Sequence, residues 1–330
     1  MRHAVVTGGG GFIGAHLVRR LLRDGWDVTV VDNMLRGAPW RLDSVRADVT
    51  IANIDVRDAE ALARAAKGAD VMFHLAAVNG TENFYKQPEL VLDVGIRGAL
   101  AAVTACQQAG VPDLVLASSA EVYQTPPVVP TDETVALTLP DSLNPRYSYG
   151  GSKIISELIA FNYGQDHFRK VQVFRPHNVY GPDMGYKHVV PQFLLRAMKA
   201  HETASGPGVT ADFAILGSGT EQRAFCYVDD IVDGIILMYL KGGHREVYHI
   251  GNDDMVSVAT LAACVGEAVG LELNIVPSTA PAGETPLRCP SIEKMRRLGY
   301  APSVSLREGL ALTLQWYREH ADKAVENEFL

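Results

Sequence analysis

The chain of 330 residues is long enough for one large domain or two smaller ones, with a sizeable hydrophobic core. Its formal net charge of −8 argues against a general nucleic-acid binder, because counterion release needs a basic face. No apolar run reaches the roughly 18 residues of a membrane span, so we expect no membrane contact. The four cysteines lack CxxC or metal-ligand spacing, and the first residues lead directly into a strand. We therefore expect no metal site and a cytoplasmic protein.

Short apolar runs alternate with helical patterns through the first half of the chain. Strands are predicted at residues 4–7, 28–32, 49–55, 71–77, 114–118 and 171–175. Helices are predicted at residues 14–23, 89–109 and 148–164. Continuous apolar strands between helices indicate an α/β fold with a doubly wound parallel sheet, the Rossmann arrangement, in which ligands bind at the carboxyl ends of the strands.

The pattern becomes less regular after about residue 181. We therefore expect a dinucleotide-binding domain over residues 1–181 and a smaller α/β lobe over residues 182–330 that binds the substrate. A strand near residues 213–250 is a candidate to rejoin the first domain.

A glycine-rich turn lies between the first strand and the first helix. Gly8, Gly11 and Gly14 permit a tight turn, let the backbone approach a pyrophosphate, and let the helix pack close to the strand. The free N–H groups and the positive dipole of the helix N-terminus then face the phosphates. The turn therefore predicts a dinucleotide site.

Asp32 ends the second predicted strand, 18 residues after Gly14. A carboxylate there is placed to bind both ribose hydroxyls of the adenosine half and would repel a 2′-phosphate, so NAD is favoured over NADP. The nearby Arg36 leaves NADP open, because arginine accepts that phosphate. Asp55 and Val56, which end another predicted strand, are placed to flank the adenine.

Tyr149 and Lys153 are four residues apart at the start of a predicted helix, so they share one helix face. An ammonium beside a phenol favours the phenolate, so we expect Lys153 to lower the pKa of Tyr149 toward working pH. Lys153 is also placed to hold the nicotinamide ribose. The pair predicts a base that moves a proton while the nicotinamide takes a hydride.

Polar residues follow the fifth predicted strand at the edge where a substrate would lie. We expect the Ser119 hydroxyl to bond a substrate oxygen alongside Tyr149, and Ser118 to cap the strand end. Glu121 is either an extra acid or base, or a group that orients its neighbours.

The ordered motifs resemble the extended short-chain dehydrogenase/reductases, specifically the NAD-dependent epimerase/dehydratases that act on nucleotide sugars, with a UDP-galactose 4-epimerase-like pattern. The resemblance covers nearly the whole chain. The motifs that carry it are Thr7–Gly14, Asp32-Asn33, His74-Leu75-Ala76-Ala77, the strand end at Ser119, Tyr149/Lys153, Arg175–Pro182, Arg223–Asp230, Tyr248–Asn252 and Arg288.

The resemblance implies that Tyr149 takes a proton from a sugar hydroxyl, that Ser119 shares this hydrogen bond, and that Lys153 tunes Tyr149 and binds NAD. Further cofactor contacts implied by the motifs are Phe12, Ile13, Asn33, Leu75, Ala76 and Ala77. Substrate contacts implied by the resemblance, mainly to the diphosphate, are Asn178, Arg223 and Arg288. Asn79 lies in an unusual loop over the expected sugar site. The family also commonly forms a homodimer through a four-helix bundle, here supplied by residues 89–109 and 148–164.

The sequence at the strand end separates the candidate reactions. Dehydratases of this family usually carry an acid at the position of Ala120, whereas 4-epimerases commonly read Ser-Ala-Thr where this chain has Ser119-Ala120-Glu121. The first hypothesis is therefore an NAD-dependent epimerase that inverts C4 through a transient ketone and internal hydride return. A dehydratase or decarboxylase that uses Glu121 is the second. A catalytically silent NAD-binding protein is an alternative of another class.

Overall fold

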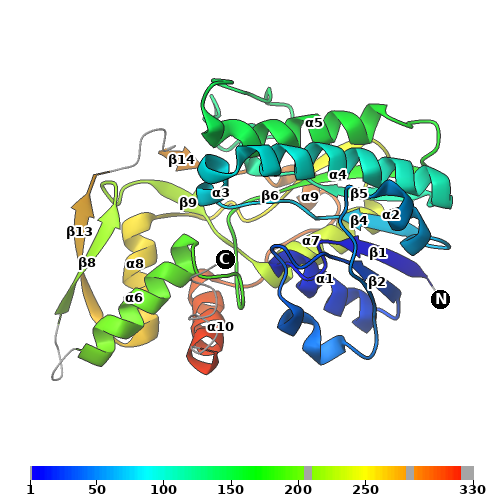
Figure 1. Cartoon of the computed structure of the whole chain (residues 1–330). Coiled ribbons are helices and arrows are strands. Elements are labelled where there is room, and N and C mark those ends of the chain that lie inside the picture. Colours follow the sequence, from blue (N-terminus) through cyan, green and yellow to red (C-terminus); the bar gives the residue numbers. More distant parts are fainter. Residues whose placement is uncertain (1, 204–209, 280–285, 321–330) are drawn as a thin grey trace.

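The main layer of the protein is a parallel sheet of seven strands in the order β11-β6-β5-β4-β1-β2-β3 (Figure 1). The structure is a computed structural model that describes residues 2–203, 210–279 and 286–320. The strands of this sheet are β1 (His3–Thr7), β2 (Asp27–Val31), β3 (Thr50–Ala52), β4 (Val71–His74), β5 (Asp113–Ala117), β6 (Lys170–Pro176) and β11 (Glu246–Ile250). The predicted doubly wound α/β fold is confirmed.

Helices cover both faces of the sheet. One face packs on α1 (Phe12–Arg23) and α7 (Val228–Lys241), and the other packs on α2 (Ala59–Ala65), α4 (Pro88–Ala109) and α5 (Ser148–Asn162). Successive side chains of β1 alternate between these two cores, as the geometry of a strand requires. Burial on both faces explains why the strands read as continuous apolar runs.

The close approach of α4 and α5 depends on Gly95. A Cβ on Gly95 would lie 2.7 Å from the Ser152 Oγ, and the Ser156 hydroxyl donates to the Gly95 carbonyl at 3.1 Å. The absence of a side chain therefore lets α5 lie directly against α4. This contact sets the position of the N-terminal turn of α5, which carries Tyr149.

Two predicted strands are too long. The strand expected at residues 49–55 ends at Ala52, and the strand expected at residues 71–77 ends at His74. Their partners end at the same level, because Ala52 pairs with Val31 and His74 pairs with Thr7. Beyond that level Ile54, Leu75, Ala76 and Ala77 lie outside the strands, and they line the pocket at the carboxyl edge of the sheet.

The second half of the chain builds a lobe with its own core. It also adds β11 to the main sheet and α7 to the helices that cover this sheet. In this lobe α6 (Val189–Thr203), α8 (Val258–Val269) and α10 (Leu306–Glu319) pack with the parallel pair β8 (Thr210–Leu216) and β13 (Glu272–Ser278). The remaining elements are β7 (Val179–Tyr180), β9 (Gln222–Ala224), β10 (Cys226–Tyr227), β12 (Met255–Ser257), β14 (Leu287–Arg288), α3 (Thr81–Lys86) and α9 (Glu293–Arg296). Within the described ranges, no helix combines the length and apolar character needed to cross a membrane.

Candidate active site

The glycine turn between β1 and α1 leaves no room for a Cβ atom at Gly8 or Gly14. Gly8 has φ +71°, and a Cβ there would lie 2.8 Å from the Ala76 backbone nitrogen. A Cβ on Gly14 would overlap the carbonyl group of Gly8. Gly11 donates its N–H to the same Gly8 carbonyl at 3.0 Å, which closes the turn. The backbone alone therefore shapes this end of the pocket.

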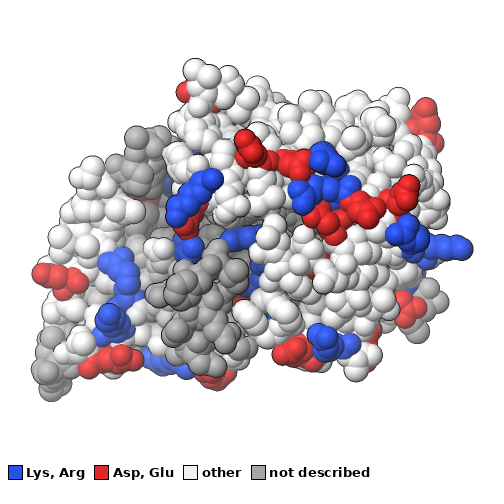
Figure 2. Space-filling view, viewed as in Figure 1, with Lys and Arg blue, Asp and Glu red and all other residues white. Residues whose placement is uncertain are grey.

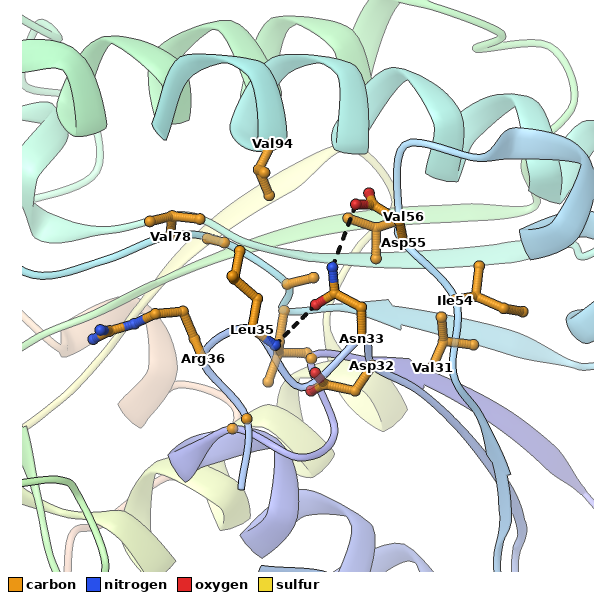
Figure 3. A pocket seen from close by; sticks show the side chains of 16 residues that line it. Val31, Asp32, Asn33, Leu35, Arg36, Ile54, Asp55, Val56, Val78 and Val94 are labelled. Carbon is orange, nitrogen blue, oxygen red and sulfur yellow. Dashed lines mark hydrogen bonds between the residues drawn. The ribbon is translucent and has the colours of Figure 1, made fainter. Parts of the chain in front are cut away.

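A pocket opens beside this turn, at the carboxyl edge of the sheet (Figure 3). The predicted cofactor residues that line it are Gly8, Gly11, Asp32, Asn33, Asp55, Val56, Leu75, Ala76 and Ala77. Phe12 and Ile13 instead begin α1, and their side chains pack against the two neighbouring cores. Only their backbone N–H groups at the helix start are suited to a phosphate.

Asp32 is buried at the mouth of the glycine turn. Its carboxylate accepts hydrogen bonds from the backbone N–H of Gly10 at 2.9 Å and of Met34 at 2.8 Å. Burial raises the pKa of Asp32, while these two hydrogen bonds act in the opposite direction. A carboxylate has about four lone-pair sites, so acceptor capacity remains for ribose hydroxyls. The Arg36 side chain points away from Asp32 in Figure 3, and this arrangement fits NAD.

Asp55 is fixed at the far side of the cavity by Arg57. The guanidinium group donates to both Asp55 oxygens and also to Asp93, and Asn33 donates to Asp55 at 3.3 Å. These hydrogen bonds hold the pKa of Asp55 below its ordinary value. The adjacent Val56 supplies an apolar surface suited to a base.

Tyr149 and Lys153 lie in the first turns of α5, and both side chains are buried. The Lys153 Nζ lies 5.7 Å from the centroid of the Tyr149 ring and donates to the Ala117 carbonyl at 2.8 Å. The ammonium is therefore bonded to the end of β5.

The expected lowering of the Tyr149 pKa by Lys153 is wrong for this structure. Burial raises the pKa of Tyr149, with the Glu121 charge acting in the same direction and the hydrogen bond to Ser119 acting against it. Burial also lowers the pKa of Lys153 to about 8, although the Glu157 carboxylate opposes that change. The spacing of the pair predicted a shared helix face, but it did not include the cost of burying both groups.

Ser119 caps a short 3₁₀ helix, η2 (Ala120–Val122), and its Oγ accepts the Glu121 N–H at 3.1 Å. The same hydroxyl is hydrogen-bonded to Tyr149, so the structure brings these two predicted residues together. Ser118 instead donates to Glu157, which also forms a buried ion pair with Arg175. Ser118 therefore belongs to the packing behind the site.

Glu121 lies between two arginines. The Arg146 Nη2 donates to one carboxylate oxygen at 3.0 Å, and the Arg288 Nη1 donates to the other at 2.6 Å. Burial raises the pKa of Glu121, but the Arg288 and Arg146 charges outweigh burial and lower the pKa overall. Glu121 is thus held as a carboxylate. Sequence reasoning missed Arg146, whose place three residues before Tyr149 was the available signal.

This cluster of Arg146, Glu121 and Arg288 carries one positive charge in excess. The Arg146 Nη1 and the Arg288 Nε are buried, and neither has a hydrogen-bond acceptor within the described part of the chain. Buried donors usually have a partner, because an unpaired one costs about 1–3 kcal/mol. The cluster is therefore suited to an anionic or oxygen-rich group of a ligand.

Two further predicted substrate residues donate to backbone carbonyls. Arg223 on β9 pairs in register with Arg288 on β14, but its Nη1 donates to the carbonyls of Gln222 and Pro286. Asn178 has φ +40° and donates to the Ala224 carbonyl at 2.9 Å.

Asn79 lies in an exposed turn, where its Oδ1 accepts the Gly80 N–H at 2.7 Å. On the face shown in Figure 2, basic and acidic side chains of the described residues are interspersed, with no large area of a single sign.

Comparisons with known proteins agree with this geometry. The model of the NAD dependent epimerase/dehydratase family matches residues 4–251. The UDP-N-acetyl-alpha-D-glucosaminuronate decarboxylase of Bacillus cytotoxicus is 28% identical over 339 aligned residues, which cover 99% of each chain.

Two solved structures share the fold over nearly their full length. UDP-glucose 4-epimerase from Thermotoga maritima, solved with UDP-glucose, has a TM-score of 0.84 and 28% identity, covering 97% of this chain and 99% of its own. A double mutant of dTDP-glucose 4,6-dehydratase from Streptomyces venezuelae, solved with NAD bound, has a TM-score of 0.86 and 27% identity, covering 99% of both. The family and the pocket together identify the cofactor as NAD.

Proposed function

The chain belongs to the NAD-dependent epimerase/dehydratase family of enzymes, and we propose that it decarboxylates a nucleotide-linked uronic acid. The observation that carries this proposal is the cluster of Arg146, Glu121 and Arg288 beside Tyr149. Its excess positive charge and its two unpaired guanidinium donors match a sugar carboxylate. The similarity to a decarboxylase of a nucleotide-linked uronic acid supports the same substrate class.

The proposed chemistry begins with oxidation at C4 of the sugar. The Tyr149 phenolate takes the proton of the C4 hydroxyl, and Ser119 holds that oxygen in place. When bound, NAD would supply the acceptor for the C4 hydride, would return that hydride to the C4 ketone after CO2 has left, and would bring a positive charge that favours the Tyr149 phenolate. Lys153, with a pKa of about 8, is available to hold a ribose hydroxyl.

The resulting C4 ketone makes the carboxylate at C5 part of a β-keto acid. The bond between C5 and the carboxyl carbon breaks, its electron pair enters the C4–C5 enolate, and CO2 leaves. A proton from solvent then adds to C5, and the protonated Tyr149 gives its proton to the C4 oxygen when the hydride returns to C4. Arg146 and Arg288 orient the carboxylate before it departs. Because the leaving group is CO2, the reaction needs no side chain that protonates a leaving hydroxyl.

This geometry makes dehydration the least supported reaction. Loss of water needs a proton donor at the sugar, but Ala120 has no acid, and the two arginines keep Glu121 ionised. C4 epimerisation is the second candidate, because Ser119-Ala120 matches the epimerase pattern and the fold matches a UDP-glucose 4-epimerase. A neutral sugar, however, offers no anion to the arginine cluster.

The deciding experiment incubates the purified protein with NAD and matched pairs of nucleotide sugars. Each pair holds a uronic acid labelled with ¹³C at its carboxyl carbon and the neutral hexose on the same nucleotide. We expect release of ¹³CO2 and a product lighter by CO2 from the uronic acid alone. The Tyr149→Phe variant is the control and is expected to lose turnover by a factor on the order of 10² or more.

The opposite result has an equally clear signature. Neutral hexoses converted to isomers of unchanged mass, with no labelled CO2 from any uronic acid, would replace the decarboxylase with the epimerase. A product lighter by water would instead require an acid that this site does not show.

We also propose that the protein forms a homodimer through α4 and α5. These two helices carry large apolar side chains that are more than a third exposed, namely Leu92, Leu100, Ile155 and Leu158. Such a stripe on adjacent helices is suited to a second copy of itself. Light scattering measures the mass in solution, and a monomer at micromolar concentration would remove this proposal.

A further inference from the structure

Phe84 on α3 covers the Tyr149 phenol. The two rings are stacked, with centroids 5.2 Å apart and an angle of 14° between their planes. Phe84 is 3% exposed, whereas its neighbour Tyr85 on the same short helix is 51% exposed. The helix therefore turns one aromatic side chain onto Tyr149 and leaves the next in solvent.

Contacts on several sides hold Phe84 in this place. The Arg146 guanidinium lies 5.4 Å from the centroid of the Phe84 ring and also pairs with Glu121, so Phe84 contacts both Tyr149 and the arginine cluster. On the outer side of α3, Glu82 pairs with Lys86 and with Lys187 of the segment that leads into α6. The helix is thereby tied to the second lobe as well as to the catalytic edge.

The stack has two physical consequences for the phenol. It fixes the plane of the Tyr149 ring, because an offset aromatic pair resists rotation of either ring. It also keeps water from one face of the ring, and burial is the largest cause of the raised pKa of Tyr149. The charged groups around the stacked pair come from α5 (Lys153), from η2 (Glu121) and from the 3₁₀ turn Pro145–Tyr147 (Arg146, against Phe84). Phe84 is the apolar member of this set.

We propose that Phe84 is a positioning residue for the reaction, because its ring holds the Tyr149 phenol toward the Ser119 hydroxyl and excludes water from it. This inference rests on the proposed function, since it requires Tyr149 to be the base. Phe84 acts through Tyr149 and needs no contact with the reacting atoms. An ordinary core phenylalanine would affect only folding stability, so the two roles have different signatures.

The test compares Phe84→Leu with Phe84→Tyr in the NAD-loaded enzyme, by measuring kcat and KM across the pH range. In Phe84→Leu, water reaches the phenol and favours the phenolate. The acid limb of the kcat profile is therefore expected to move about one pH unit lower. The plateau of kcat is expected to fall about tenfold because the ring loses its fixed plane, with little change in KM. Phe84→Tyr keeps the stack and is expected to retain both the plateau and the limb.

Tyr85→Leu is the matched control, because it changes an exposed residue of the same helix. Thermal unfolding of each variant separates a kinetic effect from loss of the fold, and Phe84→Met replaces Phe84→Leu if the latter does not fold. An acid limb that stays at the wild-type pH in a folded Phe84 variant would overturn the inference.

Failure of the proposed function is distinguishable from failure of this inference. If Tyr149→Phe keeps normal turnover, Tyr149 is not the base and both proposals fall. If Tyr149→Phe is inactive while Phe84→Leu leaves the pH profile and kcat unchanged, only the positioning role of Phe84 is lost.

Discussion

The cofactor pocket and the sugar side of the site are held by different kinds of contact. Around the cofactor, the shape comes from the backbone of one local segment, since Gly8, Gly11 and Gly14 leave no room for side chains. On the sugar side, Arg146 and Arg288 reach Glu121 from 25 and 167 residues away in the chain. The first region therefore takes its shape from one short segment, whereas the second joins charged groups from distant segments and leaves two guanidinium donors unpaired within the described residues.

We expect the largest effect from Gly14→Ala, which changes the shape of the cofactor pocket. The new Cβ would overlap the Gly8 carbonyl, and backbone atoms have no rotamer by which to move away. We expect NAD affinity to fall by a factor on the order of 10² or more, as measured by calorimetric titration. Gly151→Ala is the control, since its Cβ would meet only the Leu139 side chain at 3.4 Å. Wild-type NAD affinity in Gly14→Ala would show that this turn does not shape the pocket.

Arg288→Met tests the sugar side with a smaller expected effect. In the inactive Tyr149→Phe background with NAD bound, we expect the affinity for a nucleotide-linked uronic acid to fall about 10²-fold. The neutral hexose on the same nucleotide should lose much less, and NAD affinity should not change. Arg223→Met, at the register partner of Arg288, should weaken both nucleotide sugars equally if Arg223 holds the diphosphate. Equal losses in Arg288→Met would instead assign Arg288 to the diphosphate.

The smallest effect concerns two histidines behind the sugar side, His177 and His249, whose rings meet edge to face with centroids 4.8 Å apart. His249 is bonded at both ring nitrogens, to the Tyr123 hydroxyl at 2.7 Å and to the carbonyl of Ser291, three residues after Arg288, at 3.2 Å. His177 has no partner at either nitrogen within the described residues. His249→Phe should therefore lower the free energy of unfolding by about 1–3 kcal/mol, whereas His177→Phe should change it by less than about 0.5 kcal/mol.

Urea unfolding measures both variants and adds a dependence on pH. Burial lowers the pKa of His249 to about 3, so the folded protein keeps this ring neutral while the unfolded chain takes up a proton below about pH 6.5. The free energy of unfolding should therefore decrease from about pH 6.5 downward, and His249→Phe should reduce that slope. Identical slopes in the wild type and the variant would show that His249 is not neutral in the fold.

The same contrast explains what the sequence predicts well. The alternation of strands and helices, the glycine turn and the acid at the end of β2 depend on neighbours a few residues away. Their pattern therefore indicated the fold and the NAD pocket. Strand ends were less predictable, because β3 stops level with the end of β2, and β4 level with the end of β1, and not where their own apolar runs stop.

The contacts on the sugar side could not be predicted from neighbouring residues in the sequence. Nothing in the sequence around Phe84 reveals that its ring meets Tyr149, and Glu121 becomes a fixed carboxylate only when Arg146 and Arg288 arrive from elsewhere. The expected effect of Lys153 on Tyr149 was wrong for the same reason. Helical spacing gives a shared face, but the balance between burial and charge belongs to the assembled site.

The place of β11 in the sheet has a consequence for synthesis on the ribosome. This strand pairs with β6 over Glu246–Ile250, after a long excursion of the chain into the second lobe. While the polypeptide emerges, β6 has one unpaired edge until residue 250 has left the exit tunnel. An open edge is a template for pairing with another nascent chain. Folding of the first half is thus tied to translation of the second, and a ribosome that stalls between them would release an aggregation-prone fragment.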